Sequence, residues 1–366
     1  MDDDFEAAKA LFLEALRCHE AGQFAQAELH YRASLCRVPG RPSTLTNLGA
    51  TLLALSRPQE ALPLLEQATQ AEPGHAEGWL QRAHALAQVG RLPEALECTG
   101  RLLALQDALA AGWALRGGLL KDLGQPQAAA QALQRAIELG AEAAVNGYLL
   151  ASLTGAGAPP RPPRGYVELL FDGYADTFDT QLLEQLQYRA PAVLARLLSA
   201  QLSQRTASAL DLGCGTGLCG PQLRPWSQRL LGVDLSPRML ALARARAVYD
   251  DLLHADIVEH LQHTSERHDL LVAADVFIYL GDLEPVFAGA ARVLRPGGLF
   301  AFSVEVASDA VDYELRSSSR YAQSERYLLA LAQAHRLGVL DLVREPLRND
   351  QREPVAGLYL LLRAAG

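Results

Sequence analysis

DLGCGTGLCG (residues 211–220) follows a short apolar run and holds four glycines in ten positions. Two patterns overlap in this stretch: GxGxxG, which begins at Gly215, and DxGxGxG, which begins at Asp211. Glycine lets a backbone turn tightly and lets a ligand approach without a Cβ in the way. Either pattern predicts a ligand-binding loop between a buried strand and a helix, and the surrounding sequence must decide between them.

The second half of the chain alternates short apolar runs with helical patterns. The runs lie at 207–212, 229–234, 251–256, 268–275 and 298–305, and helical patterns between them include 236–248 and 282–294. Strands that are apolar almost throughout are typical of a parallel sheet covered by helices on both faces. Ligands bind at the carboxyl ends of such strands. The aspartates at or beside these ends are therefore candidate site residues: Asp211, Asp234, Asp256 and Asp275.

The last two apolar runs have a different spacing. Residues 338–345 and 355–363 are separated by only nine residues, too few for a crossover helix. We therefore expect them to pair as an antiparallel hairpin. The predicted fold of this half is α/β, with a doubly wound, mostly parallel, Rossmann-like sheet that ends in a C-terminal antiparallel hairpin.

One acidic residue separates the two interpretations of the glycine loop. In a dinucleotide-binding loop the strand runs directly into GxGxxG. Here Asp211 stands two residues before Gly213, where a carboxylate suits a ligand that carries an ammonium group. With Asp234 at the end of the next run, LRPGG at 294–298 and the hairpin, this half resembles the class I S-adenosylmethionine-dependent methyltransferase family. A nicotinamide-dependent dehydrogenase is the alternative.

The resemblance implies S-adenosylmethionine as the cofactor. Residues 211–217 would hold its methionine part, and Asp234 would accept both ribose hydroxyls, a task that suits a carboxylate. Residues 256–257 would bracket the adenine, and residues 274–275 would line the floor beneath the sulfonium. For Asp256 and Asp275 the alternative is helix N-capping. The complete set assigned to the cofactor is Asp211, Leu212, Gly213, Cys214, Gly215, Thr216, Gly217, Asp234, Leu235, Asp256, Ile257, Ala274, Asp275, Tyr166, Tyr174 and Phe178.

The stretch FDGYADTFD (residues 171–179) precedes the first strand of this half. It resembles a signature found in a subgroup of these enzymes, some of which carry tetratricopeptide repeats in front. The resemblance implies helices that close over the cofactor, with Tyr166, Tyr174 and Phe178 as candidates for the lid. For Phe171 and Phe178 the alternative is that they fill a core between helices.

Methyl transfer from a sulfonium is an in-line displacement, so the protein must mainly align the nucleophile and exclude water. A general base is needed only if the acceptor atom must lose its proton early. The catalytic candidates are Asp275, Tyr279 and Tyr174, and the sequence does not choose among them.

Residues 316–328 resemble a stretch near the substrate in the same subgroup. Relatives often carry histidine where this chain has Gln323, so an acid–base role at that position is in doubt. Arg320 and Tyr321 are candidates for binding an anionic substrate, with a solvated helix face as the alternative.

The first half of the chain repeats with a period of 34 residues. Small residues and tryptophans recur in register, which predicts stacked helix pairs that bury their apolar faces against their neighbours. The segment resembles the tetratricopeptide repeat family over about residues 5–140. Arg82 and Arg116 replace a usual leucine, and Asp107 stands where the terminal proline would be. The columns are Ala27, Ala61, Ala95 and Ala129; Gly22, Ser56, Gly90 and Gly124; Leu45, Trp79 and Trp113; and Pro39 and Pro73.

These patterns predict two domains joined by a linker. Residues 1–154 form the repeat domain, with a capping helix at 141–153, and residues 165–366 form the α/β domain. Residues 155–164, rich in proline and glycine, read as a semi-rigid linker. The family resemblance implies that the concave repeat surface binds a protein or peptide, although the repeats could instead serve only as a spacer, a dimerisation element or a solubilising domain.

Composition excludes several other classes of protein. The net charge of −9 lacks the basic surplus of a nucleic-acid binder. The acidic start and the lack of a long apolar run predict neither a signal peptide nor a membrane span. The five cysteines lack zinc-site spacing, so we predict no metal and a reducing, cytoplasmic compartment. The oligomeric state is left open.

We therefore expect an S-adenosylmethionine-dependent methyltransferase whose repeats recruit a protein partner or substrate. An alternative of another class is a repeat scaffold whose α/β domain binds the cofactor without catalysis. The methyl acceptor is not predicted.

Overall fold

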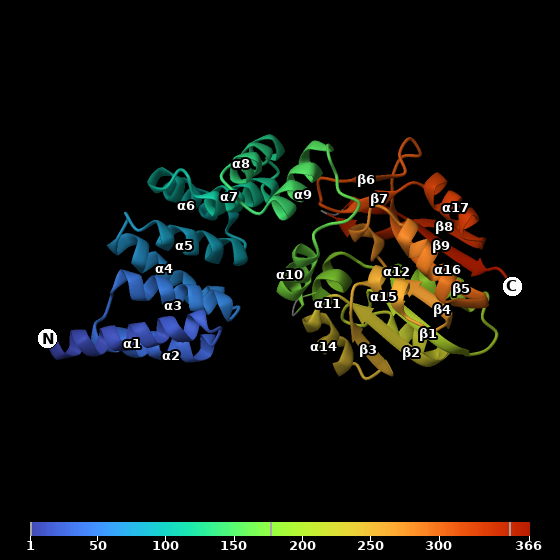
Figure 1. The fold of residues 1–366 in the computed structure, drawn as a ribbon, viewed down its shortest axis with the longest axis horizontal. Helices are drawn as coiled ribbons and strands as arrows, with labels where there is room; N and C mark the ends of the chain where they lie inside the picture. Colours follow the sequence, from blue (N-terminus) through green and yellow to red (C-terminus); the bar gives the residue numbers. More distant parts are fainter. Residues whose placement is uncertain (1, 176–177, 351–352) are drawn as a thin grey trace. The chain divides into compact units, whose positions relative to one another are not determined.

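A computed structural model of the chain describes residues 2–175, 178–350 and 353–366 (Figure 1). The chain divides after Thr154 into two compact units. We call residues 1–154 the repeat unit and residues 155–366 the sheet unit, and describe each by itself.

The described residues of the repeat unit form consecutive antiparallel helices joined by short turns (Figure 1). The four alanines at 34-residue spacing are fully buried where paired helices meet. The repeat column Gly22, Ser56, Gly90 and Gly124 lies in turns between helices and has positive φ throughout, 73° at Gly22 and 58° at Ser56. This backbone conformation explains the preference for glycine in that column. The helices are α1 (Asp2–Glu20), α2 (Phe24–Arg37), α3 (Pro42–Ala54), α4 (Pro58–Ala71), α5 (Ala76–Gln88), α6 (Leu92–Leu105), α7 (Ala110–Asp122), α8 (Pro126–Glu138) and α9 (Ala143–Thr154).

The tryptophan column makes the same hydrogen bond in two successive repeats. Trp79 Nε1 donates to the Pro73 carbonyl at 2.9 Å, and Trp113 Nε1 donates to the Asp107 carbonyl at 2.8 Å. Because the acceptor is a backbone carbonyl, aspartate can replace the terminal proline without loss of this contact.

The two arginines that replace leucine each donate a hydrogen bond to a threonine hydroxyl. Arg82 donates to the Thr69 hydroxyl at 3.1 Å, and Arg116 donates to the Thr99 hydroxyl at 3.2 Å, each on the preceding helix. The predicted helical repeat is therefore confirmed despite these departures, and a further helix, α9, follows it at Ala143–Thr154.

The sheet unit is built on a mostly parallel sheet with the order β3-β2-β1-β4-β5 (Figure 1). β9 pairs antiparallel with β5 and β8 pairs antiparallel with β9, so the predicted fold class and its C-terminal hairpin are confirmed. β7 pairs parallel with the carboxyl end of β5, and β6 pairs antiparallel with β7. The strands are β1 (Thr206–Leu212), β2 (Ser227–Asp234), β3 (Asp251–His254), β4 (His268–Ala273), β5 (Leu294–Val306), β6 (Tyr313–Leu315), β7 (Tyr321–Gln323), β8 (Leu337–Asp350) and β9 (Glu353–Ala364).

Helices cover both faces of this sheet. One core joins Leu210 and Leu271 of the strands to α15, α16 and α17, and the other joins Ala209 and Leu270 to α12 and α13. The helical elements are α10 (Arg164–Tyr174), α11 (Phe178–Thr180), η1 (Gln181–Gln185), α12 (Ala190–Ser199), α13 (Gly220–Leu223), η2 (Arg224–Trp226), α14 (Pro237–Ala245), α15 (Ile257–His263), η3 (Phe277–Tyr279), α16 (Glu284–Val293) and α17 (Glu325–Ala334).

Residues 155–163 contain no helix and contact the sheet unit directly. The Pro159 carbonyl accepts a hydrogen bond from the Tyr321 hydroxyl at 2.6 Å, and the Pro160 carbonyl accepts one from the Gly281 N–H at 2.8 Å. This proline-rich segment therefore packs as part of the sheet unit.

Two further findings concern the chain as a whole. All five cysteines lie among the described residues and are free thiols. Within the described residues, no helix combines the length and the apolar character needed to cross a bilayer.

Candidate functional site

The glycine loop joins β1 to α13 at the carboxyl edge of the sheet. Gly213, Gly215 and Gly217 have φ of 67°, 53° and 85°, a region that side-chain-bearing residues avoid. A Cβ at Gly213 would lie 2.7 Å from the Val276 side chain, so this position has no room for one. A Cβ at Gly215 would meet only Phe178, at 4.0 Å, so the loop is open there. Gly220 starts α13, where a Cβ would lie 2.5 Å from the Val248 side chain, so this glycine serves close packing of the helix rather than the approach of a ligand.

Asp234 ends β2 and anchors the glycine loop. Its Oδ2 accepts a hydrogen bond from the Gly215 N–H at 2.8 Å, and its Oδ1 accepts one from the Ser236 N–H at 2.8 Å. Burial raises the pKa of Asp234, and these backbone hydrogen bonds oppose that rise. Both oxygens keep further lone pairs, so the carboxylate can still accept hydrogen bonds from a ligand.

Asp211 lies on the adjacent strand and is almost completely buried. It pairs in register with Gly232 of β2 and with Val272 of β4. Its Oδ2 accepts a hydrogen bond from the Tyr249 hydroxyl at 2.6 Å. Burial raises the pKa of Asp211 to about 7, although the Tyr249 hydrogen bond favours the ionised form. A cationic ligand group beside it would therefore be strongly favoured.

Asp256 and Asp275 differ in the roles that the structure gives them. Asp256 is the N-cap of α15 and accepts from the Val258 and Glu259 N–H groups at 2.8 and 3.1 Å, so the capping alternative applies to it. Its other oxygen faces Arg161 at 3.9 Å, and Ile257 beside it is partly buried. For Asp275 the capping alternative is wrong, because this carboxylate instead pairs with Arg348 of β8.

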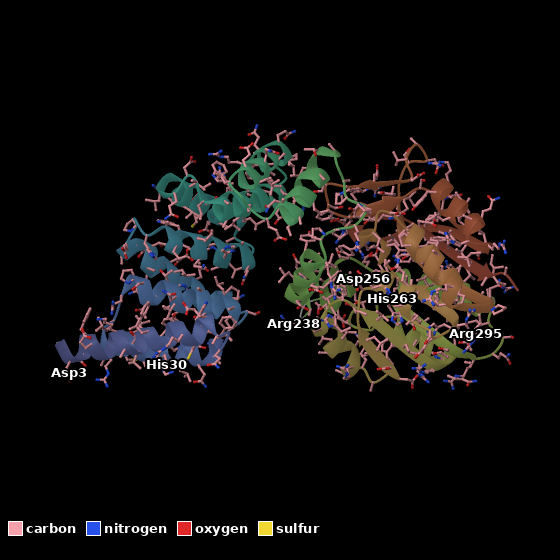
Figure 2. All side chains as sticks on the ribbon, in the orientation of Figure 1. Asp3, His30, Arg238, Asp256, His263 and Arg295 are labelled. Carbon is pink, nitrogen blue, oxygen red and sulfur yellow. The ribbon has the colours of Figure 1, made fainter. Side chains whose placement is uncertain are left out.

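The signature at 171–179 contacts the glycine loop and the loop after β2 through its two outer aspartates, Asp179 and Asp172. Asp172 accepts a hydrogen bond from the Ser236 hydroxyl, and its carbonyl accepts one from Arg238 at 2.9 Å. Arg238, at the start of α14, is labelled in Figure 2. Asp179 accepts from the Thr216 hydroxyl in the glycine loop and pairs with Arg246. Asp176 and Thr177 of this signature lie outside the described residues.

Aromatic rings connect this segment to the loop after β4. The Phe171 ring lies 6.0 Å from that of Phe178 and 5.2 Å from that of Tyr279, measured between centroids. Phe171 thus contacts both Tyr279 and Phe178, and Phe178 lies beside Gly215 of the glycine loop. Tyr174 is 49% exposed at the end of α10, and Tyr166 is partly exposed near its start.

The stretch at 316–328 is more buried than a solvated helix face. Tyr321 is fully buried on β7, which does not fit a role in binding a soluble anion. Gln323 donates to the carbonyls of Phe277 and Leu280 at 3.2 and 2.6 Å, so it holds the turn that carries Tyr279. Arg320 lies 3.8 Å from Asp350.

Sequence reasoning missed several residues of the site. Asp172 and Asp179 could have been found, since they are the acidic positions of the signature. Tyr249 and Arg348 gave no comparable signal, because each reaches its partner from a distant part of the chain: Tyr249 precedes β3, and Arg348 lies within the hairpin.

Comparison with protein families supports the interpretation of both units. Residues 210–302 match a family described as a methyltransferase domain. Residues 52–119 and 110–140 match families described as tetratricopeptide repeats. The chain joins tetratricopeptide repeats to a methyltransferase domain. The glycine loop, Asp234 and Asp275 all lie within the matched residues of this domain.

Curated relatives resemble the methyltransferase domain over part of their length. Malonyl-[acyl-carrier protein] O-methyltransferase of Salmonella typhimurium is 37% identical over 32% of this chain and 45% of its own length. Nodulation protein S of Rhizobium tropici is 35% identical over 30% of this chain and 48% of its own length. The chain thus spans about half, or less, of the length of these relatives.

Solved structures similar to the chain include methyltransferases. The N-methyltransferase NodS of Bradyrhizobium japonicum, in complex with S-adenosyl-L-homocysteine, is 23% identical with a TM-score of 0.40, covering 48% of this chain and 86% of its own. A Burkholderia thailandensis 1,6-didemethyltoxoflavin-N1-methyltransferase is 20% identical with a TM-score of 0.46, covering 58% and 94%.

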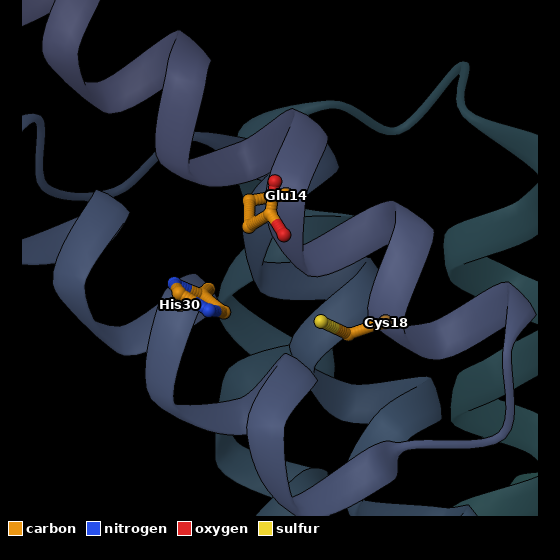
Figure 3. Close-up of side chains that lie close together, drawn as sticks. All are labelled: Glu14, Cys18 and His30. Carbon is orange, nitrogen blue, oxygen red and sulfur yellow. The ribbon is translucent and has the colours of Figure 1, made fainter.

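Among the described residues, one group in the repeats has the side chains of a metal site. Glu14 and Cys18 of α1 and His30 of α2 offer ligand atoms that all lie within 4.8 Å of one another (Figure 3). Cysteine, histidine and carboxylate are zinc ligands. Glu14 is paired with Arg17, however, and its side chain is 44% exposed, so we propose no metal here.

Proposed function

We propose that the chain is an S-adenosylmethionine-dependent methyltransferase. The observation that carries this proposal is the placement of two buried or partly buried aspartates, Asp211 and Asp234, around an open glycine loop at the carboxyl ends of adjacent parallel strands. Asp211 supplies a carboxylate for an ammonium, Asp234 supplies one for a diol, and Gly215 leaves room for the ligand between them. A nicotinamide dinucleotide has no ammonium group for Asp211.

The residues present fit this cofactor, which would supply a reactive methyl group on a sulfonium and a neutral leaving group. Asp211 and residues 212–217 would hold its methionine part, and Asp234 with Leu235 its ribose. Asp256 and Ile257 would flank the adenine; the second oxygen of Asp256 takes no part in capping and faces Arg161 at 3.9 Å. Ala274 and Asp275 would lie beneath the sulfonium.

The chain itself would orient the reactants and exclude water. Phe178 and Phe171 lie between the glycine loop and Tyr279, and Asp172 and Asp179 hold their segment against both loops. Tyr166, Tyr174 and Phe178 would form the lid. A closed site of this kind strengthens every polar contact inside it.

Of the catalytic candidates, Asp275 is the best placed. Burial raises the pKa of Tyr279 although Arg320 opposes the rise, so at neutral pH its hydroxyl is a hydrogen-bond donor rather than a base. Tyr174 is half exposed, which suits a lid residue better than a base. Asp275 is ionisable, nearly buried and next to the loop that binds the cofactor.

Titration calorimetry with S-adenosylhomocysteine tests the function. We expect binding by the wild type, no binding of NADH, and at least about tenfold weaker binding by Asp234→Ala, the loss of about one charged hydrogen-bond pair. Asp251→Ala, an exposed aspartate at the start of β3, is the control. Absence of binding by a folded wild type would end the proposal, and unchanged affinity in the Asp234 variant would refute the ribose assignment.

We further propose that the tetratricopeptide repeats recruit a protein or peptide, as concave repeat surfaces generally do. The full chain should retain a partner from cell extract that residues 155–366 alone do not retain. Equal retention by both would contradict recruitment. The free thiols of all five cysteines support a cytoplasmic location.

A further inference from the structure

The loop after β4 carries a buried acceptor atom without a partner. The Asp275 side chain is 9% exposed, its Oδ2 is bound by Arg348, and its Oδ1 is buried with no hydrogen-bond partner. An unpaired buried oxygen is costly, and such groups in native proteins are few and usually have a functional explanation. The missing donor is therefore expected to come from a ligand.

The orientation of this carboxylate is fixed by surrounding groups. Arg348, 2% exposed, donates to Asp275 through one nitrogen and to Glu305 of β5 through the other. Burial alone would lower the pKa of Arg348, but the two carboxylates raise it, so the guanidinium stays charged. The Asp275 N–H donates to Ser303 Oγ at 2.9 Å, and its backbone has a φ of 58°. Strained backbone of this kind is often found at functional sites.

The position of Asp275 places it beside the methyl-transfer site rather than elsewhere in the sheet. Val272 of β4 is level with Asp211 of β1, so Asp275 lies three residues beyond it at the edge that carries the glycine loop. Its neighbour Val276 contacts Gly213 of that loop. A second buried acceptor without a partner, Gln323 Oε1, lies on β7, where its amide group holds the turn of Tyr279.

We propose that Asp275 Oδ1, oriented by Arg348 and Glu305, accepts a hydrogen bond from the methyl acceptor, and that this acceptor is an amine. The proposal rests on the proposed methyltransferase function. An amine carries an N–H donor, which Asp275 Oδ1 lacks. A carboxylate acceptor would bring a second negative charge against Asp275 and would offer no donor.

The chemistry of transfer agrees with a hydrogen-bonding rather than a proton-abstracting role. The amine nitrogen, bound as its free base, uses its lone pair to form the N–CH₃ bond while the C–S bond breaks and its electrons stay on sulfur. The methylated nitrogen then carries the positive charge and releases one proton to water. No proton has to be removed before attack, whereas an aliphatic hydroxyl would need a strong base. Asp275 only orients the N–H, and Arg348 is a positioning residue.

A cofactor analogue tests this without knowledge of the natural acceptor. Sinefungin is S-adenosylhomocysteine with a CH–NH₃⁺ group in place of sulfur, so its amine occupies the direction of the transferred methyl group. Calorimetry with both ligands should show that the wild type binds sinefungin at least about tenfold more tightly, through one added charged hydrogen bond. Asp275→Asn, which adds no bulk, should abolish this preference, and the ratio of the two affinities in each protein is the readout.

Arg348 has its own readout and a matched control. Arg348→Met should reduce the preference for sinefungin, Arg348→Lys should restore part of it, and Arg344→Met, on the exposed side of the same strand, should change neither affinity. If Asp275→Asn does not fold, Asp275→Ser replaces it, with circular dichroism as the check.

The outcomes separate the two proposals. If a folded wild type binds neither ligand, the methyltransferase function fails. If it binds both without preference, or if the Asp275 variant keeps the preference, the function stands and the contact assigned to Asp275 Oδ1 is overturned. Transfer of a labelled methyl group to hydroxyl or carboxylate acceptors but not to amines would overturn the amine assignment.

Discussion

Asp211 is the residue whose ionisation should control cofactor affinity. In the proposed function its carboxylate binds the ligand ammonium, and burial raises the pKa of Asp211 to about 7 in the unliganded protein. As the pH falls through 7 the carboxyl becomes protonated and loses its attraction for the ammonium. We expect affinity for S-adenosylhomocysteine to be constant above pH 8 and about tenfold lower at pH 6, from the fraction of Asp211 that is ionised.

Tyr249→Phe is the matched variant for this pH dependence. It removes a hydrogen bond that lowers the pKa of Asp211, so the midpoint of the affinity profile should move to higher pH. Calorimetry at constant ionic strength from pH 5.5 to 8.5 gives both profiles. A flat wild-type profile would show that Asp211 does not bind the ammonium.

Ser56 is the one member of its repeat column that is not glycine, and its φ of 58° is unfavourable for a residue with a Cβ. Ser56→Gly should raise the free energy of unfolding of the repeats by about 1 kcal/mol because the turn is then unstrained. Gly90→Ser, with a φ of 79° and nothing within 4 Å of a new Cβ, should lower it by a similar amount. Urea denaturation followed by circular dichroism checks both, and equal stabilities would contradict the strain.

At the scale of elements, Asp179 holds α11 to the glycine loop. Asp179 accepts from Thr216 and pairs with Arg246, and its side chain is 39% exposed. Asp179→Ala should therefore weaken S-adenosylhomocysteine binding only modestly, by about threefold, because partly exposed pairs are screened by water. It should also speed amide hydrogen exchange in residues 178–185.

The control for this segment is Glu168→Ala on α10, whose carboxylate pairs with Arg164 and contacts neither loop. It should leave affinity and exchange unchanged. If both variants behaved alike, α11 would not act through the glycine loop.

Elements formed by local patterns were predictable, whereas the contacts between them were only partly so. The period of 34 residues fixed the helix pairs because each turn depends on nearby residues such as Gly22. Apolar runs located the strands, and their ends located Asp211 and Asp234. The contacts of Tyr249 with Asp211 and of Arg348 with Asp275 depend on packing between distant segments. No repeating pattern in the sequence reveals that packing.

At the scale of the whole molecule, the two units differ in how their sequence specifies them. Each repeat contacts its neighbours along the chain, so departures such as Asp107 are absorbed locally through a backbone carbonyl. The sheet unit brings β8, near the end of the chain, against the loop after β4. Its site therefore depends on the complete fold. A shortened chain must keep every segment that this fold needs, which makes the N-terminal boundary of the sheet unit important for activity.

The contacts of Pro159 and Pro160 predict where that boundary lies. Among the contacts that a chain starting at Gly165 loses, and a chain starting at Gly155 keeps, are the hydrogen bonds that Tyr321, Gly281 and Asp282 donate to Pro159 and Pro160. At about 1 kcal/mol for each bond, the shorter chain should unfold several degrees lower in a thermal scan. A chain that starts at Ala158 keeps these bonds and should match the longer one. Equal melting temperatures for all three would mean that residues 155–164 are only a linker.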